Sequence, residues 1–323
     1  MPFKVIVTRD FDHMSEVAAS ILVDSVKEAL GKKGGCVLGL ATGNSPTGLY
    51  KQLAKAADAG AFDSSRVQSF NLDEYIGLPG ENAQQRALHR ESYSFFMIQE
   101  LFSLLQKKFA ESSVPWGTLI DQGRLVAELT AHPEDYVMQG RDKGKAVVIK
   151  PDARSDYLRW IRSEILDEYE KKIAAAGGID LQVVGVGGRG HVAFHEAGIP
   201  FEGNRMLLVK LDDNTVKNAV TDGHFATTEE SPQYAISMGA ELVYKAKAVL
   251  LLASGSRKAE PVAESLLREP DCSVPISYGQ LSSREGRRVV YVLDKAAAAR
   301  TLENIDAIGA RGIEVEDISD REA

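Results

Sequence analysis

Short apolar runs alternate with longer segments of helical periodicity along most of this 323-residue chain. The pattern begins with an apolar run at 3–7 and an amphipathic segment at 14–30, and it ends with the pair 289–293 and 296–305. Short apolar runs indicate buried strands, and strands that alternate with helices pair in parallel beneath helices on both faces. We therefore expect an α/β fold with an open, mostly parallel sheet and helices on both of its faces.

Two regions depart from this alternation. Residues 107–154 carry prolines, scattered charge and weak periodicity, so we expect an insertion with some structure of its own. Residues 312–323 are acidic and are expected to form a mobile tail. The remaining chain, residues 1–311, is expected to form a single α/β domain that contains the insertion.

Charge and composition exclude several classes of protein. A formal net charge of −8 argues against a nucleic-acid partner, which would require a basic face. The longest apolar run, 248–253, is too short to span a bilayer, and the N-terminal run is too short for a signal peptide. The two cysteines lack metal-site spacing and suggest reduced thiols. We expect a cytoplasmic protein with no nucleic-acid or membrane partner and no bound metal, and a homo-oligomer is left open.

A glycine-rich loop follows the apolar run 181–186 and carries two histidines and a glutamate, at His191, His195 and Glu196. Ligands bind at the carboxyl ends of strands in open α/β sheets, and glycine lets the backbone approach them closely. The loop makes His191 and Glu196 catalytic candidates and Gly188 and Arg189 binding candidates. The glycine spacing differs from the dinucleotide fingerprint, and a plain turn with a solvated histidine is the alternative.

Two further strand–helix junctions have the composition of phosphate sites. The first contains Thr42, Gly43, Asn44 and Ser45, whose amides and hydroxyls could bind a phosphate at a helix N-terminus. The alternative is that Thr42 or Ser45 only caps that helix. At the second junction, Lys258 lies in the first turn of a helix, where a cation is unfavourable unless an anion is bound.

A pair of carboxylates, Asp73 and Glu74, follows a third expected strand at 67–72. Adjacent residues of a strand point in opposite directions, so at most one of the two faces a cleft. A carboxylate in a partly dry cleft has a raised pKa and can act as a proton-abstracting base. The alternative is a helix cap by Asp73.

Together these motifs resemble the glucosamine-6-phosphate deaminase family, which shares a superfamily with 6-phosphogluconolactonases. The resemblance rests on four segments, 38–48, 70–75, 89–93 and 187–196, which occur in the family's order. It implies a Rossmann-like α/β fold and conversion of an amino sugar phosphate to a ketose phosphate plus ammonia, without a cofactor. The sequence Asp-Glu-Tyr at 73–75 favours the deaminase branch.

The resemblance also implies roles for individual residues. Asp73 would move a proton from C2 to C1 of the substrate, and His191, supported by Glu196, would assist opening of the sugar ring. Tyr93 would belong to a lid over the site. The phosphate would be held by Thr42, Gly43 and Lys258.

The chain departs from the family pattern near the expected site. Arg189 stands where the family has an aspartate that tunes the histidine, and His195 stands where it has an asparagine. Arg189 would lower the imidazole pKa, or could instead bind a carboxylate or phosphate. The phosphate-binding arginine expected after residues 213–215 is missing, which leaves Lys217 and His224 as candidate replacements. Two alternatives therefore stand beside the deaminase: a lactonase-like hydrolase and a non-catalytic sugar-phosphate-binding protein.

Overall fold

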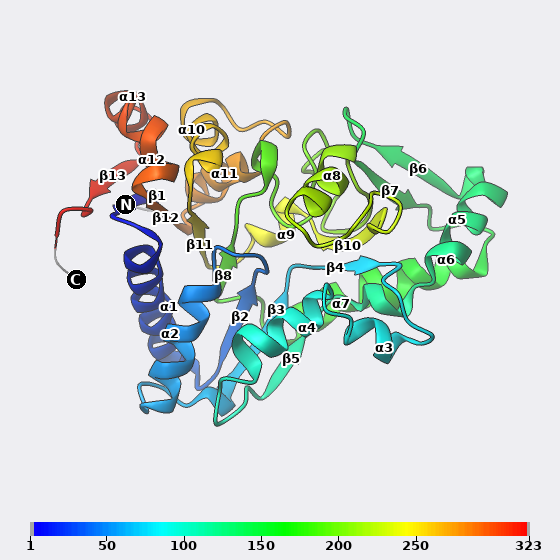
Figure 1. Ribbon diagram of the computed structural model, residues 1–323, viewed down its shortest axis with the longest axis horizontal. Coiled ribbons are helices and arrows are strands. Elements are labelled where there is room, and N and C mark those ends of the chain that lie inside the picture. Colours follow the sequence, from blue (N-terminus) through cyan, green and yellow to red (C-terminus); the bar gives the residue numbers. More distant parts are fainter. Residues whose placement is uncertain (1–2, 322–323) are drawn as a thin grey trace.

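The computed structural model describes residues 3–321 and contains a main sheet in which every strand pair is parallel (Figure 1). In spatial order its strands are β13 (Glu314–Asp317), β1 (Phe3–Thr8), β12 (Arg288–Asp294), β11 (Ala248–Ala253), β8 (Leu181–Val184), β2 (Cys36–Leu40), β3 (Val67–Asn71) and β5 (Glu111–Ser113). Burial of nearly every side chain of β2, β8 and β11 explains why the apolar runs identified them. The expected α/β fold is confirmed.

Helices pack around this sheet and cover its apolar side chains. The long helix α1 contacts β1, β2, β11 and β12 and packs along α2, while α11 and α12 contact β1 and β12. The helices are α1 (Phe11–Lys33), α2 (Thr47–Asp58), α3 (Ala83–Ala87), α4 (Tyr93–Met97), α5 (Gln122–Ala131), α6 (Asp156–Trp160), α7 (Glu168–Ala175), α8 (Asp213–Thr221), α9 (Ala240–Val243), α10 (Ala259–Leu267), α11 (Tyr278–Arg284), α12 (Lys295–Leu302) and α13 (Ile305–Gly309). A π-helical segment, Ile161–Asp167, joins α6 to α7, so residues 156–175 form one continuous helical stretch.

A second, antiparallel sheet was not expected from the sequence. Its strands, in spatial order, are β4 (Asp73–Ile76), β10 (Tyr234–Met238), β9 (Met206–Lys210), β7 (Lys145–Ile149) and β6 (Tyr136–Gln139). The strand–helix–strand order of β9, α8 and β10 is typical of a parallel crossover, yet β9 and β10 pair in antiparallel fashion. Both strands therefore belong to this separate sheet.

Residues 107–154 are divided between the two sheets, which differs from the single insertion expected. Strand β5 extends the edge of the main sheet, whereas β6 and β7 form the edge of the second sheet. The sequence Glu-Ser-Ser of β5 has no apolar run, because an edge strand needs less burial.

The acidic tail is also more ordered than expected. Residues 314–317 form β13, which pairs in parallel with β1. The Lys4 ammonium lies 3.2 Å from Glu314 and 2.6 Å from Glu316, so the acidic side chains have a local partner. The last two residues of the expected tail, 322–323, lie outside the described residues.

One residue, Leu72, joins the two sheets. Its amide donates to the Leu40 carbonyl of the main sheet (3.2 Å), and its carbonyl accepts from the Met238 amide of the second sheet (2.7 Å). Asp73 follows at once as the first residue of β4. The carboxyl end of β3 therefore meets the second sheet at Asp73. Among the helices formed by residues 3–321, none combines the length and apolar character needed to cross a membrane.

Candidate functional site

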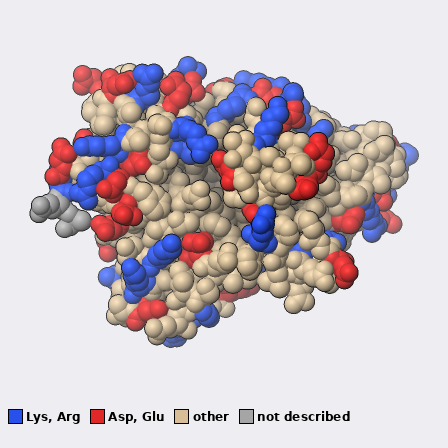
Figure 2. Space-filling view, viewed as in Figure 1, with Lys and Arg blue, Asp and Glu red and all other residues tan. Residues whose placement is uncertain are grey.

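A cavity of about 370 Å³ opens where the carboxyl ends of β2, β3, β8 and β11 face the second sheet. Figure 2 shows the surface hollowed in the middle of the molecule, with basic side chains at the upper rim of the hollow. The cavity is lined by Phe11, Ala41, Thr42, Gly43, Asn44, Ser45, Leu72, Asp73, Tyr93, Gly185, Val186, Gly187, His191, Ala193, Phe194, Asp222, His224, Ser254, Arg257 and Lys258. The structure thus brings together nine of the residues that the sequence singled out: Thr42, Gly43, Asn44, Ser45, Asp73, Tyr93, His191, His224 and Lys258.

The two adjacent carboxylates point in opposite directions, as their neighbouring positions on a strand predict. Asp73 faces the cavity and is only 5% exposed. Burial, with a smaller effect of the Glu74 charge, raises the pKa of the Asp73 carboxyl well above its usual range. Asp73 begins a strand and does not cap a helix. A buried carboxyl whose pKa is raised toward neutrality is suited to take up a proton from a ligand.

Glu74 points away from the cavity and anchors the segment that carries Tyr93. Its carboxylate accepts hydrogen bonds from the amides of Tyr75, Tyr93 and Ser94 and from the hydroxyls of Ser92 and Ser94, at 2.8–3.0 Å. Burial raises the pKa of Glu74, and the hydrogen bonds from Tyr93, Ser94 and Ser92 act in the opposite direction. A fully buried carboxylate thus fixes the N-terminus of α4 beside the cavity.

Tyr93 lines the cavity within an aromatic cluster. Its ring stacks on Phe194 with centroids 5.8 Å apart and lies 5.0 Å from the ring of Tyr75. Phe194 belongs to the glycine-rich loop, so the α4 segment and that loop contact each other across the cavity wall. This placement is compatible with the lid role that the resemblance implies.

His191 lines the cavity with Glu196 behind it. The distance from His191 Nδ1 to a carboxylate oxygen of Glu196 is 3.3 Å. Burial acts to raise the pKa of Glu196, but the hydrogen bond with His191 and those with Thr215 and the Asp212 amide outweigh it, so that this pKa is lowered. A Cβ at Gly187 would lie 1.6 Å from His191 Nε2, so the close approach requires glycine there.

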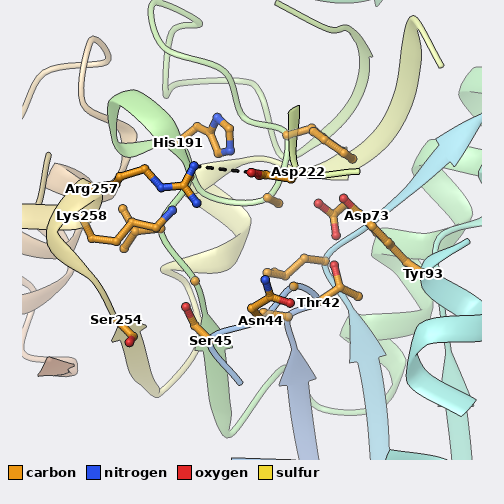
Figure 3. Close-up of a pocket in the computed structure, with 18 of the residues that line it drawn as sticks. Thr42, Asn44, Ser45, Asp73, Tyr93, His191, Asp222, Ser254, Arg257 and Lys258 are labelled. Atoms are coloured by element: carbon orange, nitrogen blue, oxygen red, sulfur yellow. Dashed lines mark hydrogen bonds and ion pairs between the residues drawn. The ribbon is translucent and has the colours of Figure 1, made fainter. Parts of the chain in front are cut away.

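The Thr42–Ser45 turn and Lys258 also line the cavity, and Lys258 lies across the cavity from Asp73 (Figure 3). Helix α2 has no side-chain cap, so neither Thr42 nor Ser45 serves the capping role considered as the alternative. Burial, and then the charge of Arg257, lowers the pKa of Lys258. Within residues 3–321 no carboxylate lies within 4.0 Å of the Lys258 ammonium. Hydroxyls, backbone amides and an ammonium gather here as a phosphate would require.

Gly188 and Arg189 do not line this cavity, which differs from the binding role expected for them. The Arg189 guanidinium is paired with the carboxylate of Asp142, in the β6–β7 loop, at 2.6 Å, and its side chain is 52% exposed. Both residues border a separate small hollow of about 40 Å³ on the far side of His191. Arg189 therefore links the glycine-rich loop to the second sheet. Its partner in the structure is a carboxylate, one of the two kinds of group that the sequence suggested it could bind.

His195, which replaces the family's asparagine, is fully buried and serves as a structural link. Its Nδ1 accepts from the Ala240 amide and its Nε2 lies 3.0 Å from the Ile199 carbonyl, which assigns the proton to Nε2. Burial lowers the pKa of His195 to about 4. This neutral imidazole joins the glycine-rich loop to α9.

Two charged residues of the cavity, Arg257 and Asp222, were not assigned to it from the sequence alone. Arg257 and Asp222 line the cavity and pair with each other at 3.4 Å. His224, one of the candidate replacements for the missing arginine, also lines the cavity and pairs with Glu91 at 2.7 Å. The position of Arg257 beside Lys258 was the available signal. The described residues contain no group of three or more His, Cys, Asp or Glu side chains that could hold a metal ion.

Comparison with known proteins agrees with the resemblance. No protein-family model matches the chain. Glucosamine-6-phosphate deaminase of Clostridium botulinum (strain Loch Maree / Type A3) is 32% identical over 297 residues, which cover 92% of this chain and 98% of that protein. The enzyme of the same name from Thermoanaerobacter sp. (strain X514) is 32% identical over 296 residues, with 92% and 94% covered.

Solved structures give the same result for the fold. A monomeric glucosamine-6-phosphate deaminase, described as a missing link of the NagB superfamily, superposes with a TM-score of 0.68 at 26% identity, covering 92% of this chain and 99% of that one. A 6-phosphogluconolactonase from Leishmania guyanensis shares the fold, with a TM-score of 0.58 at 18% identity and with 92% and 98% covered. Because the two curated deaminases are 32% identical to the chain over 92% of its length, the chain belongs to the glucosamine-6-phosphate deaminase family.

Proposed function

We propose that the chain converts glucosamine-6-phosphate, or a closely related amino sugar phosphate, to a ketose phosphate and ammonia. One observation carries this proposal: a single cavity holds a buried carboxylate with a raised pKa, Asp73, and a cationic, hydroxyl-rich side at Lys258 and the Thr42–Ser45 turn. A sugar phosphate has the matching polarity, with an anion at C6 and the reacting carbons C1 and C2 at the other end.

In this proposal the cationic side fixes the substrate. The phosphate accepts hydrogen bonds from the turn and pairs with the Lys258 ammonium, which lies in the same cavity. Asp73 lies across the cavity from Lys258 (Figure 3). A phosphate held at Lys258 would therefore place C1 and C2 toward Asp73. Positioning of this kind lowers the entropic barrier of the chemical step.

His191 is proposed to open the pyranose ring. It takes the proton of the C1 hydroxyl and returns a proton to the ring oxygen, which gives the open-chain aldehyde. The neighbouring Glu196 carboxylate, 3.3 Å away, stabilises the imidazolium formed between the two transfers.

Asp73 is proposed to move one proton between two carbons. Its carboxylate removes the proton from C2 of the aldehyde while the C2 ammonium gives a proton to the C1 oxygen, which leaves an enolamine with a hydroxyl group at C1. Asp73 then delivers its proton to C1. The product is an iminium at C2, to which water adds before ammonia leaves, so the ketose phosphate forms with all atoms accounted for. One carboxylate close to both carbons can serve both steps. Proton transfers and addition of water need no organic cofactor.

The direct test is ammonia release by the purified chain from glucosamine-6-phosphate and from galactosamine-6-phosphate, with glucosamine as the control that lacks the phosphate. The proposal predicts ammonia from at least one phosphorylated sugar and a rate at least about tenfold lower from glucosamine, because charged hydrogen bonds to the phosphate are lost. If the chain binds both sugar phosphates but releases no ammonia, it is instead the non-catalytic sugar-phosphate-binding protein.

Glu196→Gln is expected to lower kcat by on the order of a hundredfold, because a neutral amide cannot stabilise the imidazolium that proton transfer creates. The KM should change less, since Glu196 lies behind His191 and does not line the cavity. Steady-state kinetics would check both values. Glu202→Gln, at an exposed carboxylate outside the cavity, is the control. An unchanged kcat in Glu196→Gln would exclude this role for the pair.

Arg189→Ala is expected to leave kcat/KM within about fivefold of the wild type, because exposed ion pairs contribute little. The arginine is paired with Asp142 and is not a cavity residue. A measured loss above a hundredfold would show that Arg189 acts on the reaction itself, as the sequence alone suggested.

We also propose a cytoplasmic location. Cys36 and Cys272 are free and buried, and burial raises the pKa of the Cys36 thiol to about 12, which suits a reducing compartment. The net charge of −8 supports the prediction that nucleic acid is not a partner. A homo-oligomer stays a prediction that light scattering of the purified chain would check.

A further inference from the structure

Two opposite charges meet at the cationic side of the cavity. An Nη atom of Arg257 lies 3.4 Å from a carboxylate oxygen of Asp222, and both residues line the cavity (Figure 3). Arg257 precedes helix α10, and Asp222 follows helix α8. His224, which follows α8 in the same loop as Asp222, also lines the cavity but is paired with Glu91. Asp222 is therefore the residue of this loop that pairs with the Arg257 guanidinium.

This ion pair is poorly suited to a purely structural role. The side chain of Arg257 is 81% exposed and that of Asp222 is 45% exposed. Ion pairs between exposed side chains contribute little to stability, so the guanidinium can exchange one anion for another at small cost.

The position of Asp222 in its own helix points the same way. It is the C-cap residue of α8, where the helix dipole disfavours a negative charge. Local helix stability therefore does not explain an acidic residue at this place, whereas the adjacent cation does.

The charges at this side of the cavity set what can bind there. Lys258 and Arg257 contribute two positive charges, and Asp222 offsets one of them. A phosphate monoester carries about −1.5 to −2 charge near pH 7 and offers three acceptor oxygens, so it competes for the guanidinium better than one carboxylate does.

We propose that Arg257 is a second phosphate-binding cation, and that Asp222 is a built-in competitor that holds its guanidinium until a dianionic phosphate displaces the carboxylate. The proposal deepens the proposed function and rests on a sugar phosphate being the ligand. It gives this chain a guanidinium in place of the arginine missing after residues 213–215, delivered from a different element. Asp222 also favours product release, because it recaptures Arg257.

The test is calorimetric binding of inorganic phosphate to the full chain in four forms: wild type, Arg257→Ala, Asp222→Asn and the double variant. Arg257→Ala should weaken binding about tenfold to a hundredfold, since a charged hydrogen-bonding partner is lost. Asp222→Asn should tighten binding severalfold, because the competitor is neutral. The double variant should bind more tightly than Arg257→Ala, because Asp222 no longer repels the phosphate held by Lys258.

The opposite signs of the two single variants separate this proposal from a structural ion pair. If the pair only positioned the loop, both variants would weaken binding alike and the double variant would be no worse, and this result would overturn the proposal. So would wild-type affinity in Arg257→Ala. The control is Arg284→Ala, which breaks an exposed pair with Glu269 away from the cavity and should bind phosphate as the wild type does.

Turnover distinguishes failure of this inference from failure of the proposed function. With amino sugar phosphate as substrate, Arg257→Ala should raise KM more than it lowers kcat, and Asp222→Asn should lower KM. Phosphate binding with the expected signs but no ammonia from the wild type would overturn the deaminase assignment alone. Ammonia from the wild type without those signs would overturn the role of Arg257 and Asp222 alone.

Discussion

Asp73→Asn is expected to lower kcat/KM for ammonia release by roughly 10²- to 10⁴-fold, the usual contribution of a positioned general base. Asparagine keeps the size of the side chain but cannot take up the proton from C2. Since Asp73 lies at the junction of the two sheets with its side chain in the cavity, no other carboxylate of β4 can replace it. Glu74, its neighbour, is engaged in five hydrogen bonds on the other face.

The dependence of wild-type activity on pH should also show that Asp73 acts as the base. The base must be ionised, and burial raises the pKa of Asp73 well above its usual range. Activity should therefore fall as the pH drops through this raised pKa, at a higher pH than an exposed aspartate would give. Asp63→Asn removes an exposed carboxylate paired with Lys107 and is the matched control, with full activity expected. Wild-type kcat/KM in Asp73→Asn would contradict the assignment of the base.

Glu74→Ala is expected to destabilise the fold by at least about 3 kcal/mol, because each buried donor left without a partner costs about 1–3 kcal/mol. The carboxylate is fully buried and satisfies amides and hydroxyls of the segment from Ser92 to Ser94. Its loss should also release Tyr93 from the cavity wall, so activity should decrease even in the fraction that stays folded. Urea unfolding followed by circular dichroism would measure the stability difference.

Glu74→Gln separates the charge from the shape. The amide retains one accepting oxygen but turns an NH2 group toward donors, so an intermediate loss of stability is expected. Glu303→Ala, at an exposed side chain that ends α12, should change the free energy of unfolding by less than about 0.5 kcal/mol. A similar small change in Glu74→Ala would mean that the five hydrogen bonds do not hold the segment in solution.

The main sheet was predictable because its central strands are buried on both faces. Strands β2, β8 and β11 consist mostly of apolar residues, and the helices between them have clear periodicity. The second sheet was not predictable in the same way. Only one residue separates β4 from β3, without a turn signal, and the edge strand β6 is largely exposed.

The candidate site could be located from the sequence only in part. Glycine-rich turns, hydroxyl-rich turns and a pair of carboxylates at strand ends are local patterns, and these identified Thr42, Asp73, His191 and Lys258. Arg257 and Asp222 are exposed charges on different elements, and nothing local indicates that they meet. The partner of Arg189 could not be predicted for the same reason, since Asp142 lies in a region whose strands were not expected.

The measurement that tests the central claim most directly is a comparison of two reactions with one preparation of the wild type: ammonia release from amino sugar phosphate and hydrolysis of a 6-phosphogluconolactone. The account predicts ammonia and ketose phosphate in equal amounts, with lactone hydrolysis at the uncatalysed rate. Lactone hydrolysis without ammonia would contradict it and assign the cavity, with His191 in proton transfer, to the hydrolase alternative.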